Sequence, residues 1–159
     1  MGGREIRAAR RREGGREVTA SYRGSCLCGA CGLTAELKEK TAGICHCGMC
    51  RKWSGGMMVS IECDRLDFDA DAPIGIYRAS EWGERVFCKE CGTSLAWRMQ
   101  DGTHQVVSVQ VFDDPGAFPV VSEIFIDEKP RSYALAGETA KFTGAQVFQM
   151  FAPNSGERV

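Results

Sequence analysis

Long apolar runs are absent from this sequence of 159 residues. No stretch approaches the roughly 20 consecutive apolar residues that a membrane-spanning helix needs, so membrane insertion is not expected. The first 17 residues contain six Arg, three Glu and four Gly, and no apolar stretch follows these charges as it does in a secretory signal. We therefore expect residues 1–19 to form a disordered, Arg-rich leader.

An excess of positive charge is also missing. The chain has 20 Lys and Arg against 21 Asp and Glu, a formal net charge of −1. Six Arg and three Glu give the leader +3, so the remaining residues carry about −4. Arg10–Arg12 is the one dense basic run, and the acidic remainder offers no basic face for a phosphate backbone. A nucleic-acid partner is therefore not expected.

Before the tail, no segment shows the 3.6-residue apolar period of an amphipathic helix. Short stretches rich in Val, Ile, Phe, Tyr and Thr alternate instead with Gly, Asp and Pro, which is typical of strands joined by tight turns. The clearest strands are expected at 57–63, 74–80, 94–99, 105–111 and 123–126. Asp101-Gly102 indicates a hairpin between two of them. The pattern predicts a mainly β fold of short antiparallel strands.

Length and composition predict one β domain at residues 20–136, followed by a C-terminal extension at residues 137–159. Within the extension, Ala145–Phe151 carries apolar residues at the spacing of a short amphipathic helix. We expect this helix to lie against the domain. The alternative is a contact with a second copy of the chain, which would make a homodimer.

Cysteine is abundant. The nine cysteines are an odd number in a chain without an apparent export signal, which fits disulfide pairing poorly. In a reducing compartment, clustered cysteines indicate metal ligands or redox thiols. We therefore expect a cytoplasmic protein in which cysteine thiolates bind metal.

Four cysteines form two pairs at ligand spacing. Cys88-Lys89-Glu90-Cys91, followed by Gly92, is a C-x-x-C knuckle, and Cys26 with Cys28 can supply its partner pair. Zinc prefers four tetrahedral ligands, and a site in which the protein provides all four is structural. Cys26, Cys28, Cys88 and Cys91 are therefore predicted to hold one structural zinc ion.

A third cluster, Cys45, Cys47 and Cys50, offers three thiolates close in sequence. Three protein ligands and one open position are typical of catalytic zinc. A thiol or carbonyl substrate entering the open position would be deprotonated or polarised. The directly following Arg51 could offset the thiolate charge or bind a substrate carboxylate bidentately, although it could equally be a solvated surface charge. The chain is thus expected to bind two zinc ions.

Three other residues bear on these sites. His46 lies between two predicted ligands, but in an extended C-x-C segment its side chain points away from the metal, so a ligand role is the less favoured interpretation. Cys31 and Cys63 remain unassigned and are expected to be buried thiols. Either of them could instead close the second site and make it purely structural.

Three blocks together resemble the glutathione-dependent formaldehyde-activating enzyme family, which includes the domain of centromere protein V. They are Gly24-Ser25-Cys26-Leu27-Cys28-Gly29, Cys45-His46-Cys47-Gly48-Met49-Cys50-Arg51-Lys52, and Phe87-Cys88-Lys89-Glu90-Cys91-Gly92-Thr93-Ser94-Leu95. The resemblance covers roughly residues 20–133. It implies a mainly β zinc fold, the same division of ligands between two ions, and an activity that forms or cleaves a carbon–sulfur bond.

The sequence departs from the family pattern at three places. Cys31 stands where an apolar strand residue is usual, Glu123 stands near where a histidine often opens the last strand, and the 130–133 segment lacks the expected tryptophan. These departures concern the substrate pocket rather than the zinc ligands.

Three functions follow as hypotheses. The favoured one is a zinc-dependent carbon–sulfur lyase or thiol-adduct enzyme resembling S-(hydroxymethyl)glutathione synthase, with a small thiol or aldehyde adduct, glutathione among the candidates, as substrate. The alternative is a non-enzymatic zinc module that binds a protein partner. The least favoured is a thiol redox sensor built on the C-x-C-x-x-C clusters.

Overall fold

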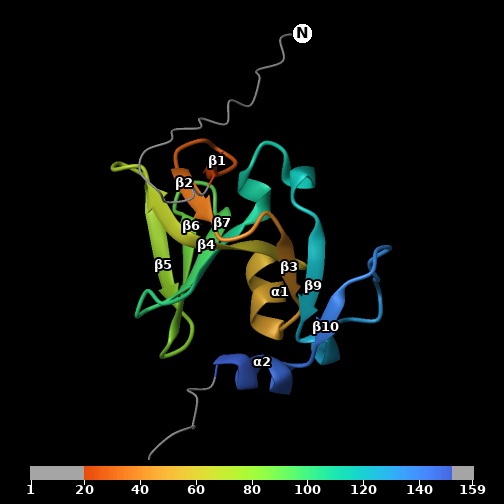
Figure 1. The fold of residues 1–159 in the computed structure, drawn as a ribbon. Helices are drawn as coiled ribbons and strands as arrows, with labels where there is room; N and C mark the ends of the chain where they lie inside the picture. Colours follow the sequence, from red (N-terminus) through yellow and green to blue (C-terminus); the bar gives the residue numbers. More distant parts are fainter. Residues whose placement is uncertain (1–19, 152–159) are drawn as a thin grey trace, which may run out of the picture. The chain divides into compact units, whose positions relative to one another are not determined.

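The structure, a computed structural model, describes residues 20–151 and consists mainly of β-strands (Figure 1). The predicted mainly β fold is confirmed. The predicted leader at residues 1–19 lies outside the described residues. The described chain divides into two compact units, the first comprising residues 20–40 and 61–118 and the second comprising residues 41–60 and 119–151. None of the described helices is both long and apolar enough to cross a membrane.

Unit 1 is built from antiparallel pairs. Strand β1 pairs with β2, β2 pairs with β4, and β5, β6, β7 and β8 pair in succession. The strand bounds are β1 Ser21–Ser25, β2 Gly32–Leu37, β4 Met58–Phe68, β5 Ile74–Arg78, β6 Gly83–Cys88, β7 Ser94–Met99 and β8 Gln105–Ser108. Strand β4 begins in unit 2 and continues in unit 1. Two 3-10 turns follow β8, η1 at Val109–Val111 and η2 at Pro115–Ala117.

The core of unit 1 comes mostly from alternate residues of these strands. Each strand directs successive side chains to opposite faces, so one face collects most of the apolar residues. Residues at 0 or 1% exposure in this core include Leu33, Ala35, Ile61, Val86, Ala96 and Val107, and Leu95 joins them at a register shift in the pairing of β6 with β7. The predicted hairpin is also confirmed: β7 and β8 are antiparallel, and Gly102 in their turn has φ +76°. Glycine is favoured at a position with this left-handed backbone conformation.

Unit 2 combines strands and short helices. It contains β3 (Ala42–Cys45), α1 (Gly48–Ser54), β9 (Val120–Ile124), η3 (Ile126–Glu128), β10 (Ala140–Phe142) and α2 (Gly144–Phe151). Strand β3 lies between the first residues of β4, antiparallel, and β9, parallel, while β10 runs parallel to β9 (Figure 1). The parallel pairs differ from the predicted antiparallel pattern, because long connections separate β3 from β9 and β9 from β10.

The C-terminal extension contributes β10 and α2 to unit 2. The predicted helix is confirmed with one additional residue at its start. Its first residue must be small, since a Cβ on Gly144 would lie 2.9 Å from the Phe125 ring. Phe148 packs edge-on against Phe125, with 5.7 Å between ring centroids. Val147 is buried, so α2 lies with one side against its own unit.

Candidate metal centres

Four thiols converge in unit 1. Cys26 and Cys28 follow β1, Cys88 ends β6, and Cys91 lies in the turn before β7. Their four sulfur atoms lie within 4.8 Å of one another. The Sγ atoms of Cys26 and Cys28 are 3.5 Å apart, and those of Cys28 and Cys88 are 3.8 Å apart. Sulfurs on a tetrahedron around zinc, at about 2.3 Å each, are about 3.8 Å apart. The donor set therefore fits a closed tetrathiolate site.

Local hydrogen bonds prepare this cluster for negative charge. The Cys31 backbone N–H donates to Cys26 Sγ at 3.2 Å, and the Thr93 hydroxyl lies 3.1 Å from Cys91 Sγ. That hydroxyl is held in place by the Leu27 N–H, which donates to it at 3.1 Å. The contact with Thr93 lowers the pKa of Cys91 to about 5. A thiolate at Cys91 is thus favoured at neutral pH, as a metal ligand requires.

Neighbouring thiols in this cluster oppose the ionisation of Cys28. A backbone hydrogen bond from Ala30 favours the Cys28 thiolate, but Cys26 and Cys91 outweigh it and raise the pKa of Cys28 to about 12. Neighbouring thiolates repel one another unless a cation lies between them. A divalent ion at the centre would remove this conflict, since it attracts all four sulfurs.

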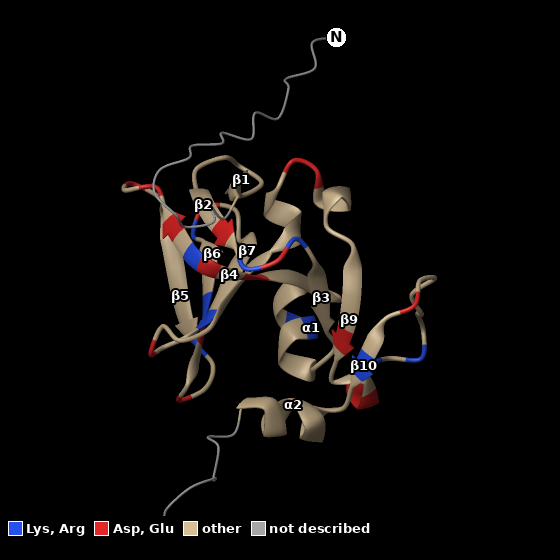
Figure 2. Cartoon of the chain, in the orientation of Figure 1, with Lys and Arg blue, Asp and Glu red and all other residues tan. Residues whose placement is uncertain are grey.

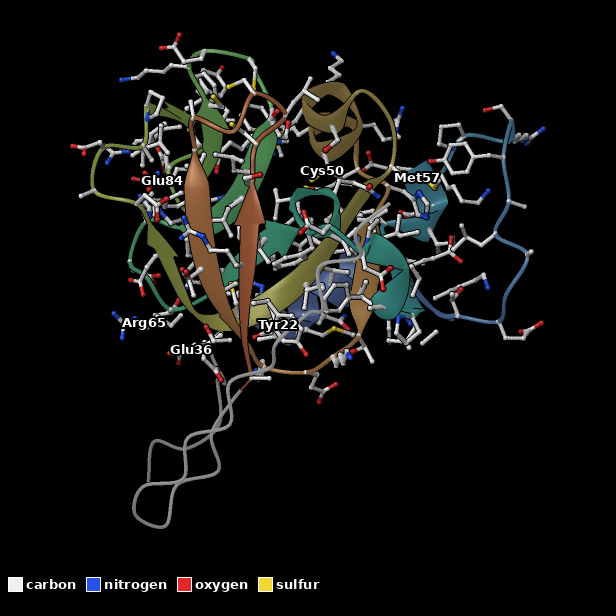
Figure 3. All side chains as sticks on the ribbon, turned by 90° about the horizontal axis from the view of Figure 1, so that it is seen from above. Tyr22, Glu36, Cys50, Met57, Arg65 and Glu84 are labelled. Carbon is white, nitrogen blue, oxygen red and sulfur yellow. The ribbon has the colours of Figure 1, made fainter. Side chains whose placement is uncertain are left out.

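Three thiols converge separately in unit 2. Cys45 ends β3, Cys47 is the N-cap of α1, and Cys50, labelled in Figure 3, lies in the first turn of that helix. Their sulfur atoms also lie within 4.8 Å of one another. The Cys50 backbone N–H donates to Cys47 Sγ at 3.4 Å, which is the capping contact of the helix. Hydrogen bonds from Cys45 and Cys50 lower the pKa of Cys47 to about 2, whereas the contacts with Cys47 and Cys50, together with burial, raise the pKa of Cys45.

Helix α1 is a feature that the sequence did not predict. It has seven residues, too few to display a helical period, and is defined by its ends. Cys47 caps its start, and Gly55, in the left-handed region at φ +69°, ends it. The helix brings Cys50 back toward Cys45 and Cys47. Within the described residues, the group contains three potential ligands and no fourth.

The two remaining cysteines are buried, as predicted. Cys31 is fully buried beside the four-thiol cluster, and burial raises its pKa to about 12. Cys63 lies on β4, where its thiol donates to the Gln105 carbonyl at 3.7 Å, and burial raises its pKa to about 12. Neither belongs to the two converging groups, so neither closes the three-thiol site. None of the nine cysteines forms a disulfide bond.

His46 makes a network that the sequence reasoning missed. Its ring is completely buried, with Nε2 2.8 Å from Glu123 Oε2 and Nδ1 3.0 Å from the Tyr133 hydroxyl. Glu123 is only 2% exposed, and its other oxygen accepts from the Thr139 hydroxyl at 2.5 Å and lies 3.6 Å from Lys141 Nζ. Figure 2 shows the acidic position on β9 beside the basic position on β10.

Hydrogen bonds keep Glu123 ionised. Burial alone would raise its pKa, but the bonds from Thr139 and His46 and the charge of Lys141 outweigh burial and hold the pKa below its ordinary value. A glutamate within the apolar stretch Val120–Ile126 was the available signal, because a buried carboxylate requires partners. The sequence could not identify those partners.

Arg51 is turned partly toward its own chain. Its Nε donates to the His46 carbonyl at 2.8 Å, and the side chain is half-buried. Glu128 is a further residue that the sequence reasoning missed: its Oε2 accepts from the Gly48 N–H at 2.8 Å, where α1 begins. Both contacts hold backbone groups within the 45–50 segment that carries the three thiols.

Comparison with known proteins gives three findings. The sequence model of the family described as glutathione-dependent formaldehyde-activating enzyme matches residues 21–128. An uncharacterized lyase of Schizosaccharomyces pombe is 31% identical over 130 residues, which cover 80% of this chain and 95% of that protein. A crystal structure of a Rhodobacter sphaeroides protein is 23% identical with a TM-score of 0.49, covering 62% of this chain and 99% of that one.

Proposed function

Because the chain belongs to the glutathione-dependent formaldehyde-activating enzyme family, we propose that it is a zinc-dependent carbon–sulfur lyase or thiol-adduct enzyme. The proposed reaction joins a thiol to an aldehyde. The sulfur–carbon bond forms, the carbonyl π bond breaks, and the thiol proton ends on the former carbonyl oxygen. Glutathione and formaldehyde, named in the family description, are the first substrate pair to test.

The observation that carries this proposal is the difference between the two cysteine groups. Four thiols surround one position and three surround the other. We assign Cys26, Cys28, Cys88 and Cys91 to a structural zinc ion, and Cys45, Cys47 and Cys50 to a catalytic one. When bound at the second site, zinc would supply positive charge and an open position for a substrate sulfur or carbonyl oxygen.

The chain itself supplies position and charge around the three thiols. The N-cap contact of α1 holds Cys47 and Cys50 together, and Arg51 Nε holds the carbonyl of His46 between the first two thiols. A guanidinium has five N–H donors, so Arg51 retains others for a substrate carboxylate. Exposed Lys52 adds a second positive charge. These two cations favour an acidic thiol such as glutathione.

Cellular location belongs to the same proposal. Nine cysteines without a disulfide bond fit a reducing compartment, and we propose the cytoplasm.

One observation favours the alternative of a non-enzymatic zinc module with a protein partner. Phe148, Met150 and Phe151 on α2 are 61, 57 and 51% exposed, an apolar group that a partner or a second copy of the chain could cover. Sedimentation of the pure protein distinguishes a homodimer from a monomer, and substrate turnover distinguishes an enzyme from a non-enzymatic zinc module.

Two measurements test the proposed function. Native mass spectrometry should find two zinc ions per chain, falling to one in a folded Cys50→Ser variant. Exchange NMR with glutathione and ¹³C-labelled formaldehyde should show faster adduct formation with the wild-type protein, and no acceleration with Cys50→Ser. Cys63→Ser is the matched control, since this buried thiol lies outside both groups and should leave both readouts unchanged. Two ions without acceleration of any thiol–aldehyde pair would refute the enzyme assignment.

A further inference from the structure

His46 is held at every polar group that it possesses. Its backbone N–H donates to the Ile124 carbonyl at 3.0 Å, and its own carbonyl accepts from Arg51 Nε at 2.8 Å. Its two ring nitrogens contact Glu123 and Tyr133 at 2.8 and 3.0 Å. A residue with all four polar groups bonded has little freedom to rotate. Since His46 separates Cys45 from Cys47, its conformation determines how these two thiols are directed.

Glu123 is the most deeply buried of the side chains that hold the ring. It lies on β9 in register with Ile44 of β3, and the next pair in that register is Ile124 with Cys45. Both carboxylate oxygens are occupied, Oε2 by His46 and Oε1 by Thr139 and Lys141. An ionised carboxylate in an apolar strand is costly unless it is fully bonded. An apolar residue at this position would fill the strand without that cost, so stability alone does not account for the charge.

We propose that Glu123 is a positioning residue, which acts through the His46 ring to fix the directions of the Cys45 and Cys47 sulfurs for metal binding. This inference rests on the proposed function to the extent that the three thiols hold a metal ion. Side chains that orient a metal-binding group through hydrogen bonds commonly change metal affinity 10- to 100-fold when removed. Glu123 contacts His46, the neighbour of two ligands, rather than a ligand itself. We therefore expect its removal to weaken metal affinity by about tenfold, the lower end of this range.

A purely structural role is the competing explanation. In that case the Glu123–His46 contact only holds β9 against β3, and its loss weakens strand pairing. The His46 amide, which donates to Ile124 at 3.0 Å across this pair, reports on pairing directly. Its hydrogen exchange should accelerate in a structural role. It should stay protected if the ring contact only directs the neighbouring thiols.

The experiment compares the full-length wild-type protein with Glu123→Gln, which keeps the size of the side chain and removes its charge. Zinc affinity at the three-thiol site is measured by chelator competition with native mass spectrometry, with the four-thiol site as an internal reference. Cobalt substitution adds a spectroscopic readout, because thiolate-to-cobalt bands depend on sulfur directions. Asp127→Asn is the matched control, since this carboxylate accepts from the Gly144 N–H at 2.8 Å on the same unit.

A double-substitution cycle tests whether Glu123 acts through His46. Glu123→Gln should weaken zinc at the three-thiol site about tenfold and shift the cobalt bands, while His46 amide protection and the control remain at wild-type values. In a His46→Gln background, the same substitution should have no further effect. Tyr133→Phe removes the other ring contact at a half-buried position and should weaken zinc affinity several-fold. This variant replaces Glu123→Gln in the test if Glu123→Gln does not fold.

Four results would overturn the inference. Unchanged zinc affinity in Glu123→Gln, or an equal effect with and without His46, would show that the carboxylate does not act through the ring. Weakened zinc together with lost His46 amide protection would assign the effect to strand pairing. If the wild-type three-thiol site bound no zinc at all, the proposed function would fail as well. That outcome is distinct, because it appears before any substitution is made.

Discussion

Replacing Cys88 with serine should release the metal of the four-thiol site and unfold the part of unit 1 around it. Cys88 is completely buried at the end of β6, and its backbone N–H and carbonyl bond to Thr93 and Gly92 in the knuckle turn. The other pair of thiols comes from the segment after β1. A metal ion here therefore ties two distant parts of the unit together.

The size of the effect follows from the ligand count. Structural zinc sites have apparent binding free energies of about 10–16 kcal/mol. Divided evenly over four thiols, one ligand contributes about 2.5–4 kcal/mol, which corresponds to roughly 100- to 1,000-fold in affinity. The stability of a whole domain is about 5–15 kcal/mol, so a loss of this size removes a large part of it.

Chelator competition followed by native mass spectrometry measures the affinity, and circular dichroism during urea titration measures the unfolding. Cys88→Ser should lose one zinc ion at a chelator concentration that leaves the wild-type protein intact, and should unfold at lower urea. Cys63→Ser, also a buried thiol of unit 1, should keep both ions. If Cys88→Ser kept both ions with wild-type affinity, the four thiols would not be a metal site, and the reasoning would be refuted.

Three further substitutions test other parts of unit 1. Glu84→Gln removes a buried carboxylate that accepts from Arg98 at 2.7 Å and Arg78 at 3.1 Å. Because Arg78 is largely exposed, we expect a loss of only about 1–2 kcal/mol in urea unfolding at pH 7. Although burial opposes it, these arginines hold the pKa of Glu84 below its ordinary value, so the loss should shrink as the pH falls through that lowered pKa. Thr93→Val removes the hydroxyl beside Cys91 and should weaken zinc at the four-thiol site about tenfold in chelator competition. Leu95→Ala empties a fully buried position and should cost about 2–5 kcal/mol in urea unfolding, without changing the zinc count.

The sequence was most informative where the relevant residues are neighbours in the chain. The three-thiol group spans six positions and the C-x-x-C knuckle four, so spacing alone indicated that their sulfurs converge. Strand β7 was predicted at its observed bounds, because its composition and the following Asp-Gly turn agree. Strand β6 was not among the predicted strands, because charged Glu84 and Arg85 interrupt its apolar pattern, although both are buried in the strand. Composition cannot show that a charge is compensated by distant residues.

Contacts between distant segments lay beyond the sequence. His46 and Glu123 are separated by 77 positions, and His46 and Tyr133 by 87. The parallel pairing of β3 with β9, which no local pattern encodes, brings His46 and Glu123 together. The departure from the family pattern at Glu123 was visible in the sequence as an anomaly. The sequence could not show which residue contacts Glu123. The structure identifies it as His46, the residue between two candidate ligands.

The basic side chains near the three thiols bear on how a substrate would bind. Arg51 Nε is directed at the His46 carbonyl, and Lys129 Nζ donates to the Tyr133 carbonyl at 2.5 Å with its charge 5.0 Å from the centre of that ring. Both cations therefore stabilise the backbone and ring that surround His46, before any substrate arrives. In the proposed reaction, charge recognition of an acidic thiol would fall to the remaining N–H groups of Arg51 and to Lys52, which lies one position further along α1. Under the proposed function, buried contacts would position the thiols, and the charges of Arg51 and Lys52 would select the substrate.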